Sequence, residues 1–341
     1  MRLAAFVASG FLCTSCILAS GCGDKPVLNA VGSYSDVAIL TSPQLLPVAT
    51  TLEQALEAKV EYSLQPESTL DVDIFDFRDR KEAAIYKNVI VLGLLEGNDA
   101  GSRELKRQLA GESMKGSAER DLFLATREDL YSRNQNVLFL AGHERNLMQS
   151  AARRQAPAIR GQIELSNRSR LLSFLTSLGR RYPVEEQIRE LGGFRLQVPQ
   201  DYEATRFFGN RERGSIEIAA RNPTRTVAIA WEPAPGPEIL DDHAYLLERR
   251  RRWGEGYLDE TLQDAGGFVW SQSSFLGAEL PELAGFWEGP TYGGPFRTTF
   301  YYDAPTKRLF GINRLCYAPN LPKHVYMRET LAVAESFEPR P

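Results

Sequence analysis

The apolar and polar positions of this chain change their pattern twice, which divides it into a leading apolar run and two longer regions. In the first long region, residues 34–145, short continuous apolar runs alternate with helix-like segments, as is typical of a parallel sheet covered on both faces. We therefore predict an N-terminal α/β sandwich. Its expected strands are residues 37–40, 72–77, 88–95, 122–125 and 137–140, and its expected helices are residues 50–58 and a helix capped by Ser102, with Leu105 and Leu109 facing inward.

A helical pattern continues over residues 146–192, where we expect connecting helices. Pro157 lies inside this pattern, and a proline in a helix interior removes a hydrogen bond and crowds the preceding turn. We expect the helix to end or kink there, and its second part to stop at Gly179.

From residue 193 to 341 the apolar runs are short and bounded by Pro and Gly, which predicts an α+β domain with a mainly antiparallel sheet. Residues 303–307 have the turn chemistry of a hairpin. Gly293, Gly294 and Pro295 predict a second tight turn. The expected strands are residues 194–198, 215–219, 226–231, 268–270, 286–288, 297–302 and 309–317, and the expected helices are residues 241–255 and 324–336.

The leading run has Arg2 as its one charge before Asp24 and ends in small residues directly before Cys22. A positive start, an apolar centre and a small-residue exit are typical of a secretory signal peptide. The cysteine after Ser20 and Gly21 resembles the lipobox of bacterial lipoproteins. We predict a signal peptide over residues 1–21, acylation of Cys22 by fatty acids such as palmitate, and a tether over residues 22–33. An ordinary cleaved signal and a retained anchor are the alternatives.

Composition narrows the possible partners. Of four cysteines, only Cys22 and Cys316 would remain after cleavage, so the mature chain would have no internal disulfide if Cys22 is acylated. The net charge of −4 is not that of a nucleic-acid-binding protein, which is strongly basic. Three histidines leave little material for a metal site, and we expect no cofactor.

Four small groups of residues could carry chemistry, and each has a structural alternative that we favour. Asp241, Asp242 and His243 are expected to cap a helix, because three consecutive helical residues do not converge on one ion. Of Asp71, Asp73 and Asp76, the first two lie on one face of an expected strand and could share acid–base work or a cation, but such charges also protect an edge strand from aggregation. His143 follows a strand at a helix start, and Cys316 is expected to be a buried thiol.

The densest charge run is residues 249–252, four consecutive arginines on an expected helix. Guanidinium groups suit carboxylates and phosphates. With nearby aromatic side chains, they could form a floor for a sugar ring or acyl chain that carries an anionic group. Alternatively, the aromatic residues are core and the arginines pair within the chain. The candidate binding residues are Arg250, Arg251, Trp253, Tyr257, Phe296 and Tyr317.

Several segments resemble a family of bacterial envelope lipoproteins that is catalogued only as a domain of unknown function. The resemblance implies a lipid-anchored envelope protein and supplies no activity. Where the family continues its Arg-rich helix through an Ile-Pro-Gly-like turn, this chain has Glu255 to Leu258. The segments are residues 64–67, the Arg-rich helix running into Trp253 and Gly256, residues 286–288 before residues 293–296, residues 317–319 and residues 326–329.

The sequence therefore predicts a cell-envelope protein with a non-catalytic binding or scaffolding role. It would be lipid-anchored on the outer membrane and face the periplasm, because Gly23 follows the cysteine instead of Asp. The expected partners are the membrane and an anionic envelope polymer or another envelope protein. The alternative is a periplasmic-side enzyme with its site at the strand ends around Ser42, Arg127 and His143.

The lipid anchor can be tested directly with Cys22→Ser. We expect this variant to leave the membrane fraction or to stay unprocessed, because a hydroxyl cannot replace the thiol that is acylated. Incorporation of labelled fatty acid, compared with the unchanged chain, is the measurement. Labelling of the Cys22→Ser variant at the same level would show that Cys22 is not the acceptor.

Overall fold

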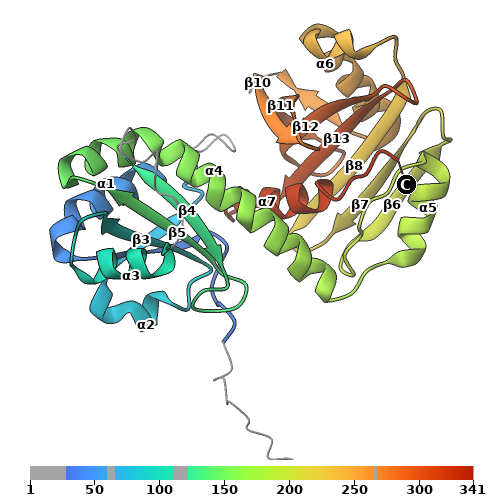
Figure 1. The fold of residues 1–341 in the computed structure, drawn as a ribbon. Helices are drawn as coiled ribbons and strands as arrows, with labels where there is room; N and C mark the ends of the chain where they lie inside the picture. The colour runs from blue at the N-terminus through green and yellow to red at the C-terminus, as the bar shows by residue number, and fades with distance from the viewer. Residues whose placement is uncertain (1–27, 60–65, 111–121, 265–266, 341) are drawn as a thin grey trace, which may run out of the picture.

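The computed structural model describes residues 28–59, 66–110, 122–264 and 267–340, and it contains two sheets joined by one long helix (Figure 1). The leading apolar run and Cys22 lie outside the described residues, as do Leu64 and Gln65. Within the described part of the chain, no helix has the length and apolarity needed to cross a bilayer.

The first sheet has five strands in the order β2-β1-β3-β5-β4. Four of them are parallel, and they match the strands expected from continuous apolar runs. Strand β4 runs antiparallel, which corrects the expectation of a wholly parallel sheet. Residues 129–135 join β4 to β5 and are too few for the crossover that a parallel pair needs. The strands are β1 (Asp36–Thr41), β2 (Asp71–Asp76), β3 (Asn88–Leu94), β4 (Phe123–Glu128) and β5 (Asn136–Gly142).

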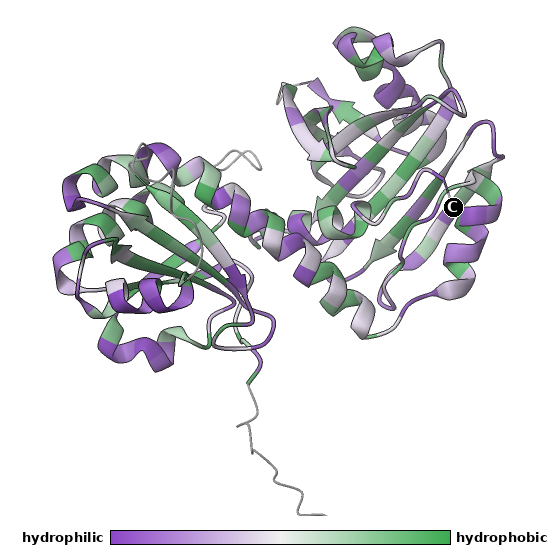
Figure 2. Ribbon diagram, viewed as in Figure 1, coloured by the Kyte–Doolittle hydropathy of each residue, from purple (hydrophilic) through white to green (hydrophobic). Residues whose placement is uncertain are grey.

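Helices cover both faces of this sheet, as predicted. Helices α1 (Leu46–Leu56) and α4 (Arg145–Ser177) pack on one face, around Ile39, Ile90 and Leu138. Helices α2 (Arg80–Ala83) and α3 (Ala100–Gln108) pack on the other. Strands β3 and β5 are therefore apolar along their length (Figure 2).

The expected helix at Ser102 begins one turn earlier than predicted. Asp99 is the N-cap of α3, and its carboxylate accepts a hydrogen bond from the backbone N–H of Ser102. Leu105 and Leu109 face the core, as expected.

Helix α4 runs through Pro157 without ending, so a stop at this residue is wrong. Proline in a helix interior costs about 3 kcal/mol. Burial of Ala156, Ile159 and Ile163 against the first sheet offsets this cost. Further along the same helix, Leu171 and Leu175 enter the core of the second sheet. Helix α4 ends at Ser177, close to the expected stop at Gly179, whose φ of 122° is in the region that favours glycine.

The second sheet is antiparallel throughout and has eight strands, seven of them in the order β10-β11-β12-β13-β8-β7-β6, with β9 beside β11. Residues 303–307 form the predicted hairpin between β12 and β13. The strands are β6 (Glu203–Gly209), β7 (Gly214–Ala220), β8 (Thr224–Pro233), β9 (Thr261–Gln263), β10 (Val269–Phe275), β11 (Ala278–Glu288), β12 (Gly293–Asp303) and β13 (Arg308–Tyr317).

Each face of the second sheet has its own core. Helices α5 (Tyr182–Gly192) and α7 (Lys323–Ala334) cover one face together with the end of α4. Helix α6 (His243–Trp253) covers the other, and Trp253 packs on Phe300. The chain is thus an α/β sandwich followed by an α+β region, as predicted.

Two local expectations in this region are wrong. Residues 194–198 form one isolated bridge, between Arg195 and Glu338, instead of a strand, although Phe194 is buried as the alternation implies. Gly293 and Gly294 lie in β12 and do not form a turn. Glycine is required there by close approach, because a Cβ on Gly294 would collide with the carbonyl oxygen of Cys316. The turn lies one step earlier, where Gly289 N–H donates to Tyr292 O.

Candidate functional site

The first and second regions meet where the N-terminus of α7 faces Glu67, which precedes β2. The Glu67 carboxylate accepts hydrogen bonds from the backbone N–H groups of Lys323, at 2.8 Å, and His324, at 3.1 Å. It also lies 3.2 Å from Nδ1 of His324. A residue of the first region thus caps a helix of the second, a favourable position for a negative charge.

Burial and hydrogen bonding act in opposite directions on these two side chains. Burial alone would raise the pKa of Glu67, but the N–H groups of Lys323 and His324 outweigh it and hold that pKa below its usual value. Burial lowers the pKa of His324, and the nearby charge of Arg328 adds to this, although Glu67 opposes it. Glu67 is therefore a carboxylate and His324 a neutral imidazole near neutral pH.

Arg328, one turn further along α7, completes the interface. Its guanidinium forms an ion pair with Glu164 of α4 at 2.7 Å and donates to the carbonyl oxygen of Thr69 at 3.0 Å. It also donates to Oγ of Ser35, which lies 3.3 Å from Nε2 of His324. These bonds link α7 to helix α4 and to two separate segments of the first region.

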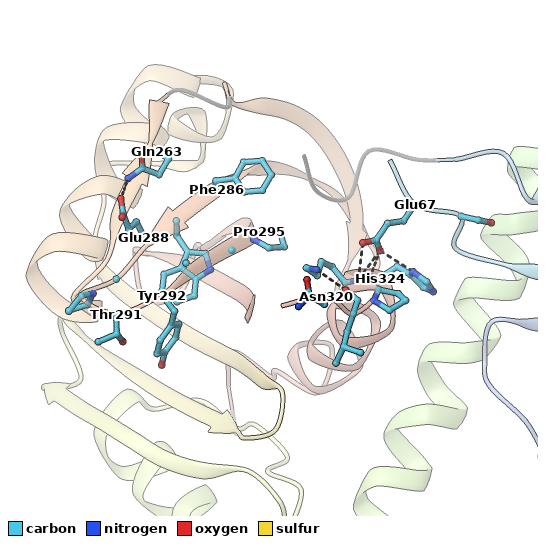
Figure 3. Close-up of a pocket in the computed structure, with 18 residues that line it drawn as sticks. Glu67, Gln263, Phe286, Glu288, Thr291, Tyr292, Pro295, Asn320 and His324 are labelled. Carbon is cyan, nitrogen blue, oxygen red and sulfur yellow. Dashed lines mark hydrogen bonds and ion pairs between the residues drawn. The ribbon is translucent and has the colours of Figure 1, made fainter. Parts of the chain in front are cut away.

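A cleft of about 1170 Å³ opens beside this interface. One wall is the end of β11 and the start of β12, where Phe286 pairs across the strands with Pro295 (Figure 3). The opposite wall is residues 320–324 together with Glu67 and Ser68. Tyr292 lies at the β11–β12 turn, is 40% exposed and stacks on Tyr317 at 4.7 Å. The cleft therefore offers aromatic and proline surfaces, a chemistry typical of ligand-binding sites.

Most polar side chains of the cleft already have partners within the protein. Glu67 and His324 hold the interface, and Nζ of Lys323 donates to the carbonyl oxygen of Leu321. Gln263 donates its amide N–H to the Glu288 carboxylate at the outer rim. These groups support the walls, and the exposed Glu288 adds a negative charge.

The candidate residues of the Arg-rich helix do not form an open floor. Arg250, Trp253 and Phe296 are buried, so the structure contradicts an exposed surface made by these three. Arg250 is ion-paired with Glu260 at 2.7 Å, donates to Thr298 and lies over the ring of Phe296. This arrangement matches the alternative in which the aromatic residues are core and the arginines pair within the chain.

The other candidates of that surface are accessible but are not gathered together. Arg251 pairs with Asp264, and the ring of Tyr257 packs at a tilt against Phe208, with 4.9 Å between the ring centroids. Tyr317 is the one that approaches the cleft, through its contact with Tyr292.

The structure also separates the residues of the alternative enzyme site. Ser42 follows β1 and donates to Asp99, and the exposed His143 follows β5, so both lie at the same edge of the first sheet. Arg127 pairs with Val137 at the start of β5 because β4 is antiparallel. The length of strand β5, about 20 Å, therefore separates Arg127 from His143.

The remaining candidates have structural roles. Asp242 caps α6, Asp76 pairs with Arg78, and Asp73 accepts from Tyr86 on the edge strand β2. Burial raises the pKa of the Cys316 thiol to about 12, which makes it a poor nucleophile. Among the described residues, no group of His, Cys, Asp and Glu side chains could hold a metal ion.

Sequence reasoning did not single out Glu67, Tyr292 or His324 as site residues. The first and last are 257 positions apart, and only the docking of α7 brings them together. A sequence signal existed for part of the site, since residues 286–295 combine aromatic residues with Gly and Pro. Comparisons with protein-family models, with curated proteins and with solved structures found no match to this chain.

Replacement of two neighbouring arginines separates structural from surface roles. Arg250→Ala should lower the free energy of unfolding by about 3 kcal/mol, because it leaves the buried Glu260 without its counterion. Arg251→Ala, the matched control, should change it by less than about 1 kcal/mol, because its ion pair is exposed. All four tryptophans, Trp231, Trp253, Trp270 and Trp287, lie in the second region, so urea unfolding followed by fluorescence measures this effect. Equal losses would contradict the assignment.

The interface should also make stability depend on pH. Burial lowers the pKa of His324 in the folded protein, whereas in the unfolded chain this pKa is about 6.5. Near and below that pH the unfolded chain binds more protons than the folded protein, so the free energy of unfolding should fall from about pH 7.5 to about pH 5.5. His324→Asn should flatten this dependence. The exposed His143→Asn is the control and should keep the slope of the unchanged chain. Identical slopes in all three proteins would show that His324 is not responsible.

Proposed function

We propose that this protein is a lipid-anchored protein of the cell envelope that binds a ligand in the cleft between its two regions, without catalysing a reaction. The observation that carries the proposal is the cleft itself, with accessible aromatic and proline surfaces beside a hydrogen-bonded interface. A site that binds needs shape and apolar area, whereas a site that catalyses also needs acid–base groups free to act. Here Glu67 and His324 hold the interface instead.

The place of the first described residues supports one end of the first sheet as the end that faces the membrane. Leu28 is 70% exposed, and Val31 forms a bridge to Tyr86 just before β3 begins. Cys22 and Leu28 are close in sequence, and an extended chain of that length spans at most about 20 Å. An acylated Cys22 would hold this end of the first sheet close to the bilayer, on the periplasmic side of the outer membrane.

Photo-crosslinking in intact envelopes tests ligand binding at the cleft. We expect a photoreactive phenylalanine at Thr291, which is exposed on the cleft rim, to form a defined adduct. The same group at Tyr182, which is 64% exposed on α5, is the control and should form none. Asn320→Trp should abolish the Thr291 adduct, because it fills the opposite wall. Equal crosslinking at both positions, or an adduct that survives the filled cleft, would contradict the proposal.

A further inference from the structure

The walls of the cleft restrict the chemistry of its ligand. Phe286 and the exposed Pro290 form one apolar ridge, and the exposed Leu321 and Pro322 form another on the opposite wall. Grooves between aromatic and proline ridges are typical sites for extended, proline-containing peptide segments, whose conformation costs little entropy to hold.

Hydrogen bonding within the protein leaves the cleft few polar side chains for a hydroxyl-rich ligand such as a glycan. Such a ligand needs several side chains with free donors and acceptors. The polar groups of the cleft without a bond inside the protein include the buried Nε1 of Trp287. In this cleft, Glu67 is bonded to two backbone N–H groups, Ser68 donates to Leu70 O and Gln263 donates to Glu288. Breaking the bonds of Glu67 would also weaken the interface that forms the opposite wall.

The charge of the cleft indicates the charge of the ligand. Glu288 is exposed at the rim, and the Glu67 carboxylate lies on the opposite wall. Among the described residues that line the cleft, Lys323 is the one with an ammonium or guanidinium group, and its ammonium donates to Leu321 O. An anionic polymer would meet two carboxylates and one ammonium here, a net charge of −1, whereas a Lys or Arg side chain could pair with the exposed carboxylate of Glu288.

We propose that the cleft binds an extended, proline-containing segment of another envelope protein, with a basic side chain of that segment placed against Glu288 and its proline rings against Phe286 and Tyr292. This inference rests on the proposed binding function and names the class of its ligand. The proposed recognition surface is therefore the cleft and not the Arg-rich helix.

Defined peptides test this inference. The purified full-length chain is titrated into fluorescein-labelled Pro-Pro-Lys-Pro-Pro, and fluorescence anisotropy is recorded. The matched control peptide, Pro-Pro-Glu-Pro-Pro, differs only in charge, and a β-1,4-linked N-acetylglucosamine tetramer represents a glycan. We expect the lysine peptide to bind at least about fivefold more tightly than the glutamate peptide, with the difference shrinking as salt is added.

Variants locate the binding. Glu288→Lys should weaken the lysine peptide about fivefold and abolish the preference over the glutamate peptide. Tyr292→Ala should weaken both peptides by about tenfold, because it removes exposed aromatic contact area. Glu82→Lys on α2 and Tyr182→Ala on α5 are the matched controls, and neither should change the affinity. Thermal unfolding of each variant establishes that the fold is intact.

Other outcomes would overturn the inference. Equal affinity for both peptides, no binding of the lysine peptide at about millimolar concentration, or preference for the sugar tetramer would each exclude a basic peptide as the ligand class. If the Thr291 adduct still forms in envelopes under those outcomes, the cleft binds something else, and only this inference fails. If the Thr291 adduct does not form, the proposed binding function itself is contradicted.

Discussion

Helix α4 belongs to two hydrophobic cores, and the arrangement of the whole molecule depends on this. Its first half packs on the α/β sheet through Ile159 and Ile163, and its second half packs on the antiparallel sheet through Leu171 and Leu175. A rigid helix shared in this way sets the distance and the rotation between the sheets. A break at Pro157 would release the first sheet from the second.

Polar contacts then fix how α7 docks against the first region. Glu67 caps the helix, and Arg328 reaches Glu164 and Thr69. Removing charges from water opposes the attraction of a buried ion pair, so such contacts contribute little net stability but penalise every other arrangement. The cleft walls are held by geometry-specific bonds rather than by apolar area alone.

The use of these polar groups in the interface leaves mainly apolar surface at the proposed binding site. The carboxylate and imidazole that would suggest chemistry, Glu67 and His324, join the two regions. What remains accessible beside them is Tyr292, Phe286 and several prolines, with Glu288 at the rim. A shift in the protonation of His324 would act on the wall of the cleft, which links the stability of the interface to the shape of the site.

The sequence by itself determined the strands of the first sheet and six of the eight strands of the second at least in part, because their apolar runs are bounded by turn residues, but it indicated neither β6 nor β9. It also indicated that the aromatic residues around Arg250 could be core and that Asp242 could cap a helix, since both depend on neighbours in the chain. Only the tertiary structure decided the direction of β4, the continuity of α4 at Pro157 and the meeting of Glu67 with His324. Each of these depends on energies gained between distant segments, through apolar burial or hydrogen bonds, and such gains leave no local pattern in the sequence.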